Sequence, residues 1–116
     1  MSERKRFNYL TIAQTQILHD WGVRLRVMFR GAVLYHVGSS TQRTGWRDVD
    51  VRLILPDKDH ARLTKSVDVH LLNVAVSLWG ERVTGLPIDF QVQQMTAANE
   101  EFGHSFRNPI GLGDAR

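Results

Sequence analysis

The sequence contains no cysteine, which excludes disulfide bonds and thiolate metal sites and is typical of a protein that stays inside the cell. It also lacks any run of about 18 uncharged apolar residues, the length that a membrane-spanning helix needs. The first residues, MSERKRFNYL, are basic and polar, without the apolar segment of a secretory signal. We therefore expect a cytoplasmic protein with no membrane attachment.

Strong charge imbalance, histidine metal motifs and internal repeats are also missing. The chain carries 15 Lys and Arg residues against 12 Asp and Glu residues, for a net charge of +3. This mild excess permits an anionic ligand such as a nucleotide and does not demand a nucleic acid. The five histidines show neither HxH nor HExxH spacing, which argues against zinc. No repeat or linker divides the 116 residues, so we expect one domain with its own core.

What the sequence does contain is an alternation of helix-like and strand-like apolar patterns. Apolar residues recur every three or four positions over about 10–29, and again from a cap at Asp57 or Asp59 to an end near Gly80. The apolar stripe of this second helix consists of Leu63, Val67, Leu71, Val74 and Leu78. Segments 32–37, 48–55 and 88–93 are short and apolar or strictly alternating, as strands are. The pattern predicts a small α/β (α+β) domain with a mixed sheet and with helices packed on one face.

The segment 97–116 carries several glycines and a proline without any periodicity. We expect a folded domain over 1–96 and an irregular C-terminal tail over 97–116. The apolar residues of that tail, Phe102, Phe106 and Ile110, are a predicted contact for a second copy of the chain or for another protein.

Three aspartates share one predicted face of the sheet. Asp48 and Asp50 alternate with buried valines in the second strand, and Asp89 alternates with Ile88 and Phe90 in the third. When these strands are neighbours and the helices cover the other face, the three carboxylates converge. Converging carboxylates repel one another unless a cation neutralises them, and hard oxygen ligands select Mg²⁺ or Mn²⁺. We therefore predict a divalent metal site formed by Asp48, Asp50 and Asp89.

A Gly-Ser pair follows the first predicted strand and supplies a second functional element. Glycine lets the backbone approach a phosphate closely, and a following turn directs N–H groups and a hydroxyl toward that anion. Gly38, Ser39 and Ser40 are therefore the predicted phosphate-binding residues. Arg43, Arg47 and Arg52 either assist them or are surface charges or partners of nearby aspartates. Taken alone, a Gly-Ser pair more often marks an ordinary turn, and alternate aspartates more often lie on a solvated sheet face.

In this order the elements resemble the nucleotidyltransferase superfamily related to DNA polymerase beta, and in size they look most like its minimal bacterial and phage members. The resemblance covers roughly 10–95 and consists of the strand AVLYHV, the pair Gly38-Ser39, the run Asp48-Val49-Asp50 and the later Ile88-Asp89-Phe90. It implies that Asp48 and Asp50 are metal ligands, that Asp89 is a ligand or base, and that the Gly-Ser turn holds a nucleoside triphosphate. Two features depart from the family: the eight residues between Ser39 and Asp48 are slightly few, and Arg52 sits where it approaches the metal site.

The resemblance implies a metal-dependent transfer of a nucleoside monophosphate from an NTP such as ATP to an acceptor hydroxyl, with Mg²⁺ or Mn²⁺ as cofactor. A catalytically degenerate protein of the same fold, which binds a nucleotide or another protein in the manner of an antitoxin, is the alternative. A nucleic-acid acceptor or a nucleic-acid-binding module has less support, because the basic residues are scattered. Larger members add an acceptor-binding domain for which this chain has no room, so we expect a homodimer or a protein partner. Trp46 either stacks on a base or covers the core, and the core is favoured.

Overall fold

The computed structural model describes residues 8–102 and 107–112. Along the chain its elements are α1 (Ile12–Met28), β1 (Val33–Val37), the short 3₁₀ turn η1 (Ser39–Thr41), β2 (Val49–Leu55), α2 (Asp57–Ser66), α3 (Val69–Thr84), β3 (Ile88–Gln94), α4 (Met95–Phe102) and β4 (Asn108–Pro109). The strands form one mixed sheet in the order β3-β2-β1-β4, in which β1 is antiparallel to both its neighbours and β2 is parallel to β3. The predicted α+β class with a mixed sheet is confirmed.

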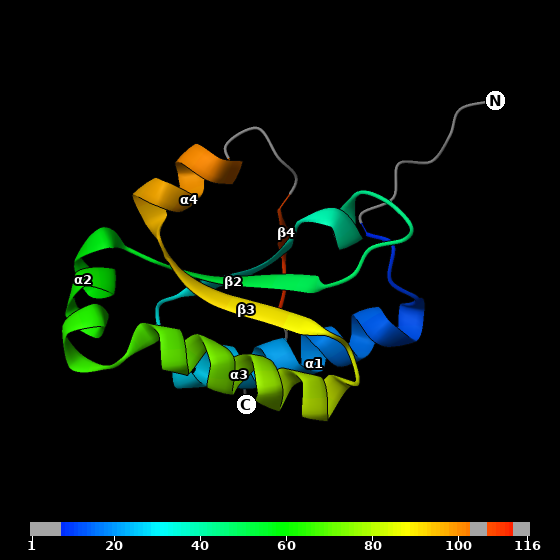
Figure 1. Ribbon diagram of the computed structural model, residues 1–116, viewed down its shortest axis with the longest axis horizontal. Coiled ribbons are helices and arrows are strands. Elements are labelled where there is room, and N and C mark those ends of the chain that lie inside the picture. Colours follow the sequence, from blue (N-terminus) through cyan, green and yellow to red (C-terminus); the bar gives the residue numbers. More distant parts are fainter. Residues whose placement is uncertain (1–7, 103–106, 113–116) are drawn as a thin grey trace.

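The main core lies between the sheet and the helices α1 and α3, which Figure 1 shows together on one side of the strands. Alternate residues of β2, Val49, Val51 and Leu53, are completely buried on that side. Trp21 of α1 meets Trp79 of α3 edge to face, with ring centroids 5.6 Å apart. Aromatic rings prefer this geometry because the positive edge of one ring faces the negative face of the other.

Gly80 does not end a helix, contrary to the sequence-based prediction. A Cβ at this position would lie 2.6 Å from a ring carbon of Trp21, so the absence of a side chain lets α3 pass close to α1. The helix continues for another turn and ends at Gly85, whose φ of 73° is the left-handed conformation that favours glycine. Close packing of two helices, and not termination, explains the glycine.

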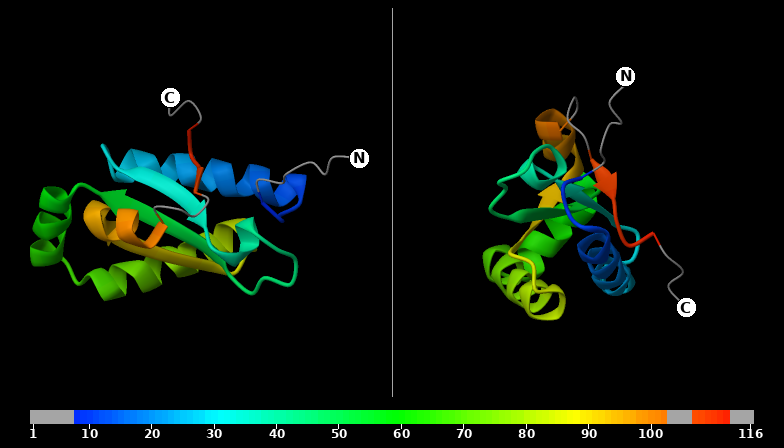
Figure 2. Two further views of the ribbon diagram at one scale, coloured as in Figure 1. Left: turned by 90° about the horizontal axis from the view of Figure 1, so that it is seen from above. Right: turned by 90° about the vertical axis from the view of Figure 1, so that its right-hand side faces the viewer.

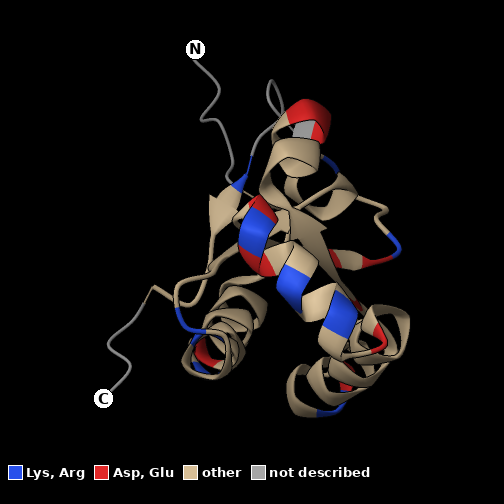
Figure 3. Ribbon diagram, turned by 90° about the vertical axis from the view of Figure 1, so that its left-hand side faces the viewer, with Lys and Arg blue, Asp and Glu red and all other residues tan. Residues whose placement is uncertain are grey.

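The single long helix predicted from Asp57 or Asp59 is two helices. Asp68 interrupts it, because its carboxylate accepts a hydrogen bond from the Leu71 N–H at 3.1 Å and so caps a new helix, α3. The residue at the start of α2 is Pro56, and neither predicted aspartate caps this helix. Asp57 instead accepts hydrogen bonds from the N–H and the hydroxyl of Thr96, at 3.0 and 2.5 Å, in the first turn of α4. The helix α2 buries none of its residues and stands at one end of the molecule (Figure 1). Figure 3, in which this end faces the viewer, shows both basic and acidic residues along it.

The stripe predicted to face the core from the second helix is mostly exposed. Leu63 is half-buried, but Val67, Leu71, Val74 and Leu78 all lie on the outside. The buried residues of α3 are instead Val76, Gly80 and Thr84. A three-to-four spacing identifies one side of a helix, and it does not reveal which of two apolar sides the sheet covers.

The segment 97–116, predicted to be irregular, is partly regular: it continues α4 as far as Phe102 and contains the short strand β4, while residues 107 and 110–112 have no regular structure. The opposite face of the sheet is not fully open. Figure 2 shows α4 across the sheet from α1 and α3. Ala98 of α4 is completely buried there. Tyr35 lies on the same side, with the guanidinium of Arg107 5.2 Å from the centre of its ring. The prediction that every helix packs on one face is therefore wrong for α4.

The strand β4 joins the edge of β1 and brings Ile110 into the core. The Ile110 N–H donates to the Leu34 carbonyl at 3.0 Å, and its side chain is 1% exposed. Ile110 is therefore not the exposed contact residue that the sequence predicted. The side chain of Phe102 and all of Phe106 lie outside the described residues.

No helix in the described ranges is long and apolar enough to cross a membrane.

Candidate functional site

Asp50 and Asp89 meet at the centre of the candidate site. They are direct partners in the parallel pairing of β2 and β3, and their side chains point away from α1 and α3. Burial raises the pKa of Asp50 to about 6; the positive charge of Arg52 opposes this, and repulsion by Asp89 and Asp48 together with a side-chain hydrogen bond to Asp89 add to it. The alternation in the sequence predicted this meeting correctly.

Arg52 is a fixed cation beside the two carboxylates. Its Nη2 lies 3.9 Å from Oδ1 of Asp50 and 3.7 Å from Oδ2 of Asp89. Its Nη1 donates to the carbonyl oxygens of Asp89 and Val51, at 2.7 and 3.1 Å. These backbone acceptors and the 9% exposure of the residue hold the guanidinium in one place. The predicted approach of Arg52 to these aspartates is confirmed.

Asp48 stands apart from this pair. It precedes β2 and is exposed, and it lines a groove together with Asp89. Within residues 8–102 and 107–112, no three acidic, histidine or cysteine side chains are grouped to hold one metal ion. Asp50 and Asp89 are therefore the paired oxygen donors of this region, and the predicted third ligand, Asp48, is not grouped with them.

The turn after β1 packs directly against Asp50. Gly38 has φ 81° and ψ −162°, a conformation that only glycine adopts readily, and a Cβ there would overlap Oδ2 of Asp50. The N–H and the hydroxyl of Thr41 donate to the Gly38 carbonyl at 3.0 and 2.6 Å, which closes the turn. Ser39 is half-exposed at its start. The predicted phosphate-binding turn and the predicted metal ligand are therefore in contact.

Ser40 was predicted to bind phosphate, but its side chain lies in the core. Its side chain is completely buried, and its Oγ lies 2.6 Å from Nε2 of His36. Burial lowers the pKa of His36 to about 4, and the charge of His19 contributes in the same direction. The Ser40 hydroxyl is thus part of the core and does not line a ligand site. Only Gly38 and Ser39 of the predicted trio remain at the surface.

We expect the buried imidazole of His36 to make stability depend on pH. A depressed pKa means that the native state resists protonation, so His36 contributes stability above pH 6.5 that is lost as the pH falls toward 4. His36→Gln lacks this titration, and the difference in free energy of unfolding between wild type and variant should shrink over that range. Urea unfolding of both proteins at closely spaced pH values measures it. A difference that stays constant would contradict a neutral buried His36.

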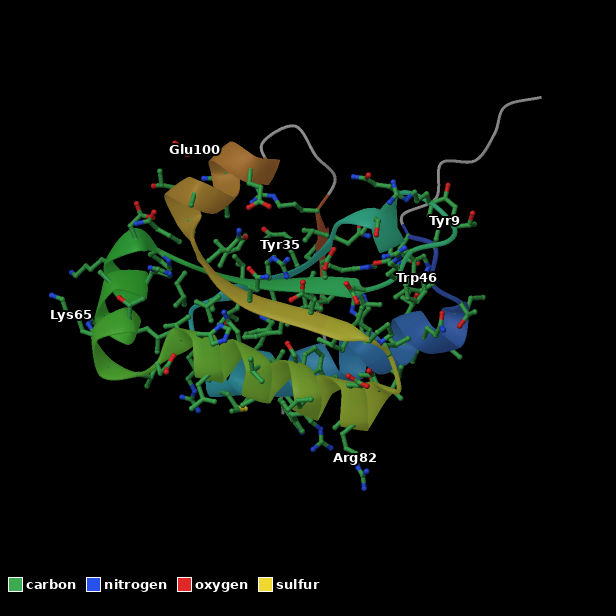
Figure 4. The ribbon with its side chains drawn as sticks, viewed as in Figure 1. Tyr9, Tyr35, Trp46, Lys65, Arg82 and Glu100 are labelled. Carbon is green, nitrogen blue, oxygen red and sulfur yellow. The ribbon has the colours of Figure 1, made fainter. Side chains whose placement is uncertain are left out.

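The loop after η1 carries Arg43 and Arg47, and both side chains are exposed. The Arg43 N–H donates to the Ser39 carbonyl at 3.0 Å, so this arginine begins directly at the turn. Trp46 is half-buried against the core, and its Nε1 donates to the Tyr9 carbonyl at 3.3 Å; Figure 4 shows the two aromatic residues side by side. The preference for a core role of Trp46 is confirmed.

Comparison with protein-family models, with curated proteins and with solved structures finds no significant match to this chain.

Proposed function

We propose that this protein is a metal-dependent nucleotidyltransferase, which moves a nucleoside monophosphate from an NTP to an acceptor hydroxyl. The observation that carries the proposal is the contact between two features: the paired carboxylates of Asp50 and Asp89, and the Gly38-Ser39 turn packed against Asp50. A carboxylate pair favours a hard divalent cation, and a glycine-containing turn at a strand end favours a phosphate. Because the carboxylate pair and the turn are adjacent, together they favour a nucleoside triphosphate with its bound metal ion.

In this proposal Asp50 and Asp89 would hold Mg²⁺ or Mn²⁺, and Asp48 would add charge from the rim. The ion, when bound, supplies positive charge that stabilises the transferring phosphate and the leaving pyrophosphate. Gly38 and Ser39 hold the triphosphate through the turn, and Arg43 and Arg47 add charge from the following loop. Asp89 accepts the proton of the acceptor hydroxyl while the oxygen of that hydroxyl attacks the α-phosphorus. A new P–O bond forms, the bond to the β-phosphate oxygen breaks, and pyrophosphate leaves.

The position of Arg52 favours a second candidate function. A guanidinium within 3.9 Å of both carboxylates already offsets part of the charge that a cation would neutralise. A protein of this fold that binds a nucleotide or another protein without catalysis would not need a metal ion, because Arg52 would supply the neutralising charge. The two candidates differ in metal dependence, because only the enzyme requires the ion.

Nucleotide binding should require Mg²⁺ and should depend on Ser39. We expect Ser39→Glu to weaken NTP binding by at least about tenfold, because it places a negative charge at the entrance of the phosphate-binding turn. Titration calorimetry with each NTP, with and without Mg²⁺, measures this. Thr44→Glu is the matched control, since it adds the same charge at an exposed position of the same loop. No binding of any NTP under either condition would leave only the protein-binding candidate.

Transfer itself is tested by incubation with each α-labelled NTP, Mg²⁺ or Mn²⁺, and a cell lysate as the pool of acceptors. The proposal expects label on an acceptor together with released pyrophosphate. Binding without transfer to any acceptor would support the non-catalytic candidate.

A further inference from the structure

The helix α3 is apolar on two sides, and only one of them is covered. Its inner side packs on α1 and the sheet through Val76 and Gly80. Its outer side exposes Leu71 and Leu78, each 62% accessible, and Val74, 42% accessible. Their spacing of three and four residues places them in one row along the helix. A helix that is apolar on both sides is typical of one covered on both sides.

This outer row borders an acidic groove of about 560 Å³ between α3 and the edge strand β3. Figure 1 shows these two elements at the front of the molecule. Val74 and Leu78 form one wall, and Ile88 and Phe90 contribute apolar surface from the strand. Three acidic residues also line the groove, Asp48, Glu81 and Asp89, and of these Asp89 is already paired with Arg52. None of the lining residues, all within the described part of the chain, is a lysine or an arginine. An occupant with apolar anchors and positive charge would complement this surface.

The edge of β3 is closed to strand addition. The Phe90 N–H donates to Oγ of Ser77 at 2.9 Å, and the Val92 N–H donates to Oδ1 of Asn73 at 3.0 Å. An added strand pairs through such N–H groups, and here two side chains of α3 already occupy them. The occupant must therefore contact side chains and not the strand backbone, as an amphipathic helix does.

We infer that the α3–β3 groove binds a cationic amphipathic helix of a partner protein. Leucine-like anchors of that helix pack on the row Leu71, Val74 and Leu78, and its Lys or Arg residues face the groove carboxylates. A second copy of the chain is a poorer occupant through this face, because a symmetric contact would bring the acidic residues of the two grooves close to one another. The contact does not depend on nucleotidyl transfer, although it would cover Asp48 and Asp89.

A panel of three labelled peptides of about 18 residues tests the inference. The first carries Leu at helical spacings of three and four with Lys on the flanks, the second has Glu in place of Lys, and the third distributes the same residues as the first around the helix. Fluorescence anisotropy at low salt should show binding of the first alone. Leu71→Gln combined with Leu78→Gln should weaken that binding at least about tenfold, because it removes two anchoring contacts.

Two further variants separate the parts of the surface. Glu81→Gln should weaken binding about threefold and reduce its dependence on salt, because one attractive charge is lost. Val83→Gln changes another exposed apolar residue of α3, which does not line the groove, and should leave binding unchanged. Equal binding of all three peptides, or no binding up to about 1 mM, would overturn the inference. Self-association of the wild type that is abolished by combining Leu71→Gln with Leu78→Gln would also overturn it. That result would assign the surface to a second copy of the chain.

Discussion

Replacing Asp50 by asparagine should lower nucleotidyl transfer about 10²–10³-fold while raising the stability of the protein at neutral pH. Under the proposed activity the ionised carboxylate is a principal ligand of the cation, and its loss should resemble the removal of one transition-state stabilising group. Asparagine keeps nearly the same shape, so the turn at Gly38 and the pairing of β2 with β3 should persist. Transfer rates and thermal melting of the two proteins, with and without Mg²⁺, measure both effects.

The stability gain has a definite sign and pH range. The raised pKa means that the native state favours protonated Asp50, so its ionisation costs stability as the pH rises from 3.8 through about 6. The asparagine side chain of the variant cannot ionise, and its amide can donate a hydrogen bond to Asp89. The variant should therefore gain about 1 kcal/mol above pH 6, a figure reduced for solvent screening of a half-buried group, and nothing below pH 3.8.

Asp59→Asn is the matched control for that substitution. Asp59 is exposed on α2, where its carboxylate lies 3.8 Å from the guanidinium of Arg62. Asp59→Asn should leave the rate of nucleotidyl transfer unchanged. It should also leave the free energy of unfolding nearly unchanged, because exposed ion pairs contribute little to stability. A large destabilisation by Asp50→Asn at neutral pH would show that its ion pair with Arg52 outweighs burial. Unchanged transfer would remove Asp50 from the catalytic residues.

Replacing Gly38 by alanine should destabilise the protein by about 2–4 kcal/mol. Two costs add: the backbone conformation at φ 81° and ψ −162° is strained for any residue with a Cβ, and that Cβ would overlap the Asp50 carboxylate. Either the turn or Asp50 must move, so nucleotide binding should fall as well. Urea unfolding and calorimetry with NTP measure the two consequences.

Gly45→Ala separates the two costs. Gly45 has φ 74° in the same loop, but a Cβ there would meet no atom within 4 Å. It should therefore show only the backbone cost, about 1 kcal/mol. Combining Gly38→Ala with Asp50→Ala should restore part of the lost stability, since the overlapping carboxylate is gone. Strict additivity of the two substitutions would contradict a direct contact between Gly38 and Asp50.

The candidate site was predictable where it depends on alternation within a strand. The period of two placed Asp50 and Asp89 on one face, and their pairing across β2 and β3 brought them together. The contact of Gly38 with Asp50 also follows from position, because Val37 pairs with Asp50 at the end of β1. Asp48 was less predictable, because it lies before the strand begins, where alternation no longer fixes the direction of a side chain.

The sequence did not reveal the hydrogen-bond partners of Arg52 and Ser40. Arg52 alternates to the acidic face, but its fixed position depends on carbonyl oxygens of two different strands. Ser40 follows a Gly-Ser turn, yet the turn rotates its hydroxyl inward to His36. Both outcomes depend on neighbours whose positions are set only when the sheet is assembled.

The sequence by itself determined the three longer strands, the buried face of β2 and of β3, and the identity of the acidic residues on the other face, because these follow from the two-residue period of an extended chain. Only the tertiary structure decided which side of α3 is covered, why Gly80 is small, and where Asp57 and Ile110 find their partners. Those features depend on contacts between residues far apart in the chain, such as Gly80 with Trp21 and Asp57 with Thr96. A local pattern carries no information about such partners. The sequence therefore identified the apolar row of α3, but only the packed structure shows that this row is exposed.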